Sequence, residues 1–121
     1  MNKTRKQATK ITAAEDGETA LRAELEFVAE TIYDQAEAAR SHADKALREL
    51  EARPWSPSLS TARAQYMEAR TAADRAEEHF TDFKSAAVDE ERLLWRDRLS
   101  IAADHAVIAM RVGDVIAKNL K

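Results

Sequence analysis

The chain has 121 residues, the length of a single domain, and it contains no cysteine, two glycines and two prolines. This composition excludes disulfides and cysteine-based zinc sites, and 34% charged residues beside 6% aromatic residues is typical of long helices rather than sheets. The net charge of −3 is unevenly spread, since residues 15–52 hold 11 acids against 4 bases.

No apolar run is long enough to cross a bilayer, and the polar N-terminus differs from a signal peptide. Arginine outnumbers lysine by 12 to 7 in an alanine-rich chain, which is typical of GC-rich bacterial or phage genomes. We therefore expect a cytoplasmic protein of a bacterium or, if phage-encoded, of its host.

The first eleven residues are predicted to be a basic, flexible arm, followed by one helical domain over residues 12–121. Four positive charges in the arm could contact nucleic-acid phosphates, with a strong salt dependence. The arm has no aromatic residue for base stacking, so a disordered, solubilising tail is the favoured interpretation. A second basic patch, at Arg92 and Arg96, is diluted by neighbouring acids. The basic residues of the arm are Lys3, Arg5, Lys6 and Lys10.

A long helix is predicted over residues 13–52. Thr12 and Glu15 fit a capping box at its start, and Asp16 before Gly17 is a rival start. Apolar residues then recur at intervals of three or four, which indicates one apolar helix face. They are Leu21, Leu25, Val28, Ile32, Ala36, Ala39, Ala43, Leu47 and Leu50.

Both prolines lie in the segment EARPWSPS, which predicts a turn over residues 53–56. Pro54 ends the first helix because it restricts the preceding residue and lacks an amide hydrogen. Ser56 and Pro57 are typical of an N-cap and a first helical residue. A connection this short makes antiparallel neighbours, and we expect Trp55 to cover the open end of their shared core.

Two further helices are predicted, over residues 57–87 and 90–119, with Asp89 as the N-cap of the last. The motif Ala-Asp-x-Ala recurs every 30 residues as ADKA, ADRA and ADHA, which favours three helices with small residues at one level. The expected fold is all-α, an antiparallel helical hairpin or three-helix bundle with coiled-coil-like packing. The alternative is an elongated two-helix hairpin, unbroken beyond Val88, that dimerises to bury its overhanging end.

The residues give no support to catalysis, a cofactor or a metal site. Each of His42, His79 and His105 has alanine three positions before it, so the Glu-x-x-His motif of di-metal bundles is absent. Two glycines cannot build a phosphate-binding loop. We therefore expect a protein that is not an enzyme.

The outer face of the first helix is the most unusual surface. Its acids recur at intervals of three or four, about 5–6 Å apart, where like charges repel. Phe27 lies among them and Tyr33 at their margin, which is typical of a contact surface for a basic protein. Alternatively, Phe27 packs under the third helix and the acids form a solvated face. The acids are Glu26, Glu30, Asp34 and Glu37.

The leading hypothesis is a non-enzymatic helical interaction protein that binds a basic partner protein through this acidic surface. It could inhibit nucleic-acid binding by competition. In composition and expected fold alone, the chain resembles small phage-encoded inhibitors, including anti-CRISPR proteins, and phage scaffolding proteins. One alternative is a nucleic-acid accessory protein that uses the basic arm. Another is a self-assembling scaffold, whose candidate homodimer contacts are Trp95, Ile101, Ile108, Val112 and Ile116.

Overall fold

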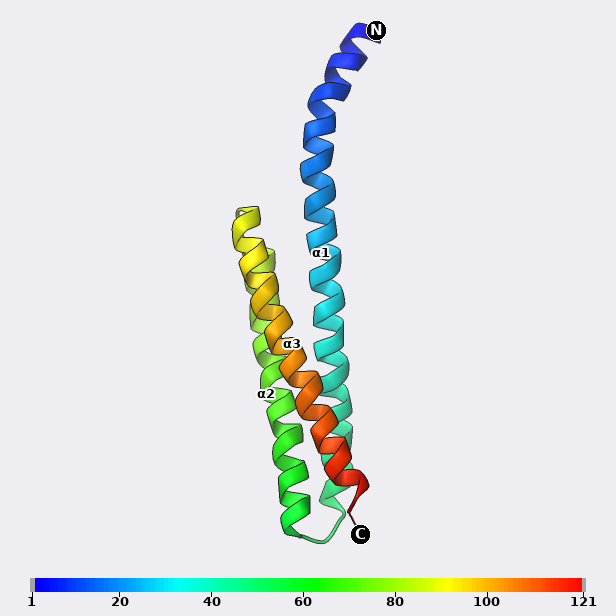
Figure 1. Cartoon of the computed structure of the whole chain (residues 1–121), viewed down its shortest axis with the longest axis vertical. Helices are drawn as coiled ribbons and strands as arrows, with labels where there is room; N and C mark the ends of the chain where they lie inside the picture. The colour runs from blue at the N-terminus through cyan, green and yellow to red at the C-terminus, as the bar shows by residue number, and fades with distance from the viewer. Residues whose placement is uncertain (1, 121) are drawn as a thin grey trace.

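Three helices that run alternately up and down form the structure, a computed structural model. It describes the backbone of residues 2–120 and the side-chain surroundings of residue 17 and residues 20–120. The helices are α1 (Asn2–Glu51), α2 (Pro57–Ser85) and α3 (Asp89–Lys118). All three pairs of helices are in contact, and α3 runs obliquely from the end of α2 to the C-terminal part of α1 (Figure 1). The predicted all-α three-helix bundle is confirmed.

The chain turns between α2 and α3, so the alternative of an unbroken second helix is wrong. Val88 is extended, with φ −130° and ψ 158°, and occupies the N-cap position that the sequence predicts for Asp89. Asp89 is instead the first helical residue, where its carboxylate accepts a hydrogen bond of 2.6 Å from Arg92. Arg92 also donates to the carbonyl oxygen of Ala86, which ties the new helix to the end of the old one.

The turn between α1 and α2 follows the prediction, except at its tryptophan. Ser56 caps α2, since its Oγ accepts a hydrogen bond of 3.0 Å from the amide of Leu59. Trp55 is 76% exposed, so the expectation that it covers the core is wrong. Leu50 and Leu59, with Leu120 packed against them, already fill that end of the bundle.

The start of α1 differs from the sequence prediction. The helix begins at Asn2, rather than near residue 13, and so includes residues 2–11 of the predicted arm. No proline interrupts it, and most residues of its first turns have good helical propensity, which outweighs the capping box at Thr12. The N-terminal part of α1 extends beyond the turn between α2 and α3 (Figure 1).

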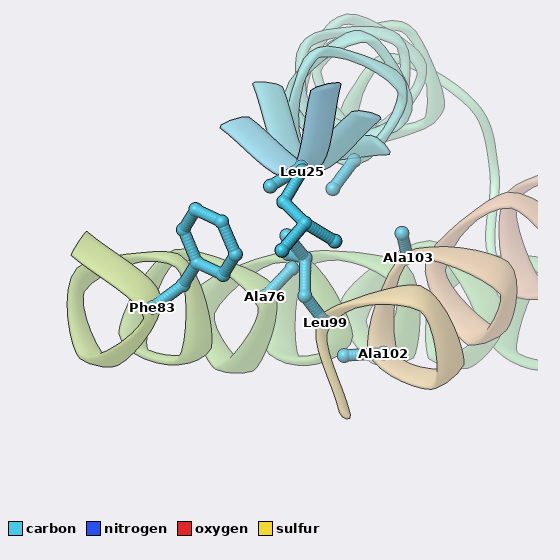
Figure 2. Packing of buried hydrophobic residues seen from close by; sticks show 8 residues of the cluster. Leu25, Ala76, Phe83, Leu99, Ala102 and Ala103 are labelled. Atoms are coloured by element: carbon cyan, nitrogen blue, oxygen red, sulfur yellow. The ribbon is translucent and has the colours of Figure 1, made fainter. Parts of the chain in front are cut away.

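Alanine dominates the core. Of the 21 buried apolar residues in the described part of the chain, 14 are alanine, which allows the helix backbones to approach closely. The buried residues of the middle layer are all alanine and come from all three helices, with the partly buried Val107 and Met110 packed against them, whereas larger residues fill the ends. Near the turn between α2 and α3, Leu25 of α1 points toward Leu99 of α3, with Phe83 of α2 beside them (Figure 2). The middle layer is Ala39, Ala72, Ala73 and Ala106.

Gly113 of α3 lies in close contact with α2. A Cβ atom built on Gly113 would lie 2.8 Å from Cε1 of Tyr66, which is only 1% exposed. The Tyr66 hydroxyl donates a hydrogen bond of 2.5 Å to Asp114. Gly113 therefore provides the space in which the tyrosine ring lies against α3.

Candidate partner-binding face

Phe27 is an exposed aromatic residue on the side of α1 that faces away from the bundle. It lies nine positions before Ala36, which is fully buried, and a rotation of about 100° per residue places the two on opposite sides of the helix. The Phe27 residue is 69% exposed. The alternative that it packs under the third helix is therefore wrong.

The four predicted acids of α1 differ in exposure, and two of them lie near basic residues of the other helices. Glu26, Glu30 and Asp34 are exposed. Glu26 and Glu30 also line a hollow of about 250 Å³ beside two bases of the other helices, Lys84 and Arg92. Glu26 and Glu30 therefore face opposite charges across this hollow.

Tyr33 contacts α2 rather than solvent alone. Its ring stacks on Phe80 with centroids 4.6 Å apart, and the ammonium group of Lys84 lies 4.7 Å from the centroid of Phe80. Burial, and then the charges of Glu37 and Glu77, raise the pKa of Tyr33. Tyr33 therefore helps to join α1 to α2 at a place where carboxylates gather.

Arg40 joins the acids of α1 to those of α2. Its guanidinium group lies 3.0 Å from Glu37 of its own helix, and 2.9 Å and 3.2 Å from Asp74 and Glu77 of α2. Only 21% of the Arg40 side chain is exposed. One arginine is thus shared by three carboxylates, which makes the acidic surfaces of the two helices continuous.

The α2 acids are the part of this surface that the sequence analysis missed. A hollow on α2 is lined by Thr81 and four carboxylates alone. Their intervals of three and four residues are readable in the sequence, but which helix they adjoin is not. We call the combined surface the acidic face; it holds eight carboxylates against Arg40, Lys84 and Arg92, a balance of −5. The eight are Glu26, Glu30, Asp34, Glu37, Asp74, Glu77, Glu78 and Asp82.

The candidate dimer contacts lie on two sides of α3. Ile101, Ile108 and Val112 are exposed, by 71%, 59% and 41%. Trp95 instead stacks on His79, with ring centroids 5.6 Å apart, and packs against the core near Leu99. Ile116 packs against the core near the other end of the bundle. The side chains of Trp95 and Ile116 are therefore packed against other residues of the same chain.

Of the candidate nucleic-acid contacts, the arm residues lie outside the described side chains and the second basic patch is paired with acids. The side chains of the arm residues Lys3, Arg5, Lys6 and Lys10 lie outside the part of the chain whose side-chain surroundings are described. Arg92 is bound to Asp89 and to a backbone carbonyl group, and Arg96 lies 3.3 Å from Asp97. The second basic patch is therefore paired with acids.

Two histidines bind carboxylates of other helices. Nε2 of His42 lies 2.7 Å from Oδ1 of Asp114, the atom that also accepts from Tyr66, so one carboxylate joins all three helices. Nε2 of His105 lies 3.0 Å from Glu68. His42, Tyr66 and Asp114 line a hollow of about 470 Å³ near the turn between α1 and α2. Among the described residues, no three acidic or histidine side chains converge on a site suited to a metal ion.

None of the helices, in their described part, has the length and apolar character needed to span a membrane. No protein-family model, curated protein or solved structure matches the chain. The argument for function therefore depends on the geometry of the molecule itself.

Proposed function

We propose that this chain is a non-enzymatic interaction protein that binds a basic partner protein through the acidic face, with Phe27 as an apolar anchor. The observation that carries the proposal is the 69% exposure of Phe27 beside a surface with a charge balance of −5. Burying a phenylalanine side chain contributes about 1.5–3 kcal/mol, which makes this residue a candidate hot spot.

The two parts of the face have different roles in this proposal. Carboxylates at the rim attract a basic partner and raise the association rate, and salt screens this effect. Phe27 becomes buried only in the complex, so its loss acts mainly on the dissociation rate. The proposal therefore predicts that salt and truncation of Phe27 weaken binding in separable ways.

A groove that normally holds nucleic acid is a suitable partner surface. Such grooves present rows of lysine and arginine to phosphates, and the acids of α1 follow one another at about 5–6 Å. By occupying such a groove, the chain would act as an inhibitor that competes with nucleic acid.

The first test is affinity capture from a bacterial lysate, with identification by mass spectrometry. The variant E30K/D34K should lose the captured protein while retaining the wild-type helical circular dichroism. A matched control, E49K/E51K, makes the same change in net charge on the same helix away from the acidic face and should retain it. Equal capture by wild type and E30K/D34K would refute the proposal.

The identified partner then permits a quantitative test. Phe27→Ala should raise the Kd about 30-fold, the equivalent of about 2 kcal/mol, at both low and high salt. Competition is measured by adding the partner's nucleic acid to the complex. An unchanged Kd for Phe27→Ala would exclude the anchor role.

A further inference from the structure

The outer face of α3 carries a row of exposed apolar side chains. Four of them are spaced by seven residues, and the fifth lies one helical turn from its neighbours. We call these five residues the α3 stripe. They are Leu94 (46% exposed), Ile101 (71%), Ile108 (59%), Val112 (41%) and Val115 (62%).

The α3 stripe faces away from the chain's own core. Ile108 is nine residues from Leu99, which is fully buried, so the two lie on opposite sides of α3. From Leu94 to Val115 the stripe extends about 30 Å at 1.5 Å per residue. A seven-residue apolar repeat is the pattern of a coiled-coil seam, and a continuous exposed row of this kind marks a contact surface.

Two polar residues share this side of α3, and each has a partner within the chain, His105 on α2 and Arg98 on α3 itself. His105 binds Glu68 through Nε2 at 3.0 Å. The guanidinium group of Arg98 lies 4.9 Å from the ring centroid of Trp95. Because their polar groups have partners within the bundle, they leave the stripe available for apolar contact.

The charges along one edge of the stripe identify its occupant. Asp97, Asp104, Arg111 and Lys118 are all exposed and follow one another at intervals of seven, with the two acids first and the two bases last. A second α3 in the opposite direction would bring Asp97 beside Lys118 of the second copy, and Asp104 beside Arg111. A parallel copy would bring acids to the level of acids and bases to the level of bases.

We propose that two copies of the chain associate through their α3 stripes, antiparallel, about a two-fold axis beside Ile108. In this arrangement Ile101 of one copy packs against Val115 of the other, and the two Ile108 side chains meet near the axis. The interface is isologous, so each charge pair occurs twice. The stripe lies on α3, whereas the acidic face belongs to α1 and α2, so this proposal is independent of the proposed function.

The oligomeric state is tested by sedimentation equilibrium over a range of concentrations. The wild type should have the mass of two chains, and I101E/I108E the mass of one, with unchanged helical circular dichroism. Leu21→Glu, at an exposed leucine of α1, is the matched control and should remain a dimer. A wild type of one-chain mass at every concentration would overturn the proposal, and so would an I101E/I108E variant that stays dimeric.

Charge exchange tests the direction of the helices. Asp104→Lys alone, or Arg111→Glu alone, places like charges in both pairs of the antiparallel dimer and should raise its Kd several-fold. Mixing the two variants restores opposite charges in both pairs, so the mixed dimer should regain the wild-type Kd. A mixture no tighter than either variant alone would refute the antiparallel arrangement.

Crosslinking gives a second measure of direction, because the chain has no cysteine of its own. Under oxidation, Ile101→Cys chains should form disulfides with Val115→Cys chains and much less with themselves. Efficient disulfides between two Ile101→Cys chains would instead show a parallel dimer and overturn the proposal.

Discussion

Replacing Gly113 with alanine should destabilise the bundle, although alanine is the better helix former. The new Cβ would lie 2.8 Å from Cε1 and 2.9 Å from Cδ1 of Tyr66, whereas ordinary contacts begin at 3.4 Å. The ring would have to move by about 0.6 Å, the difference between 3.4 Å and 2.8 Å. Tyr66 is buried and bound to Asp114, so this movement disturbs both its packing and its hydrogen bond.

The magnitude follows from opposing contributions. Overpacking a buried site costs about 1–3 kcal/mol, and weakening a hydrogen bond to a charged acceptor costs about 1.5–3 kcal/mol when the bond is lost. Removing a glycine from a helix interior gains about 1 kcal/mol. We therefore expect Gly113→Ala to lower the free energy of unfolding by about 1–3 kcal/mol.

The assay is urea unfolding followed by circular dichroism, with two controls. Gly17→Ala should cause no loss, since a Cβ there meets nothing within 4 Å. In a Tyr66→Leu background the clash is removed, and Gly113→Ala should become neutral or stabilising. If Gly113→Ala is as destabilising with leucine at position 66 as with tyrosine, the reasoning from the tyrosine contact is wrong.

Two further predictions concern charged groups. Arg40→Met leaves three neighbouring carboxylates without their shared base and should lower the free energy of unfolding, measured in urea, by about 1 kcal/mol, with part of the loss recovered at high salt. Arg70→Met removes a base that is bound to one carboxylate and should lower the free energy of unfolding by less. A loss for Arg40→Met that is equal to or smaller than the loss for Arg70→Met would contradict this prediction. Burial, and then the hydrogen bond to Asp114, raise the pKa of Tyr66 in the folded protein. The contribution of Tyr66 to the free energy of unfolding is therefore constant below its unfolded pKa of about 10 and falls as the pH rises above it. Tyr66→Phe should reduce this alkaline loss in unfolding curves from pH 9 to 11, and an unchanged loss would exclude the tyrosine as its source.

The helical organisation could be predicted because its signals are local. Pro54, Ser56 and Pro57 act on their immediate neighbours, and the turn near Val88 coincides with a change in the apolar pattern followed by three acids. The start of α1 was mispredicted for a related reason. A capping box at Thr12 makes a helix start favourable there, but nothing in the preceding residues prevents a helix from continuing.

Contacts between helices could not be predicted. His42 and Asp114 are 72 residues apart, and their hydrogen bond depends on the rotation and height at which α3 meets α1. The same holds for Tyr33, which the sequence placed at the margin of an exposed acidic surface and the structure stacks on Phe80. Phe27 could be predicted to lie outside because its position depends only on helical periodicity within α1.

The alanine-rich core also affects how much solvent-accessible surface the molecule has. A globular protein of 13.6 kDa exposes about 6,600 Å², whereas this chain exposes 8352 Å². The excess, about 1,800 Å², is roughly twice the area of about 800 Å² that each partner contributes to a standard protein interface. Thin helices packed through small side chains, together with the projecting part of α1, thus give a short chain more accessible surface than a compact domain of the same mass.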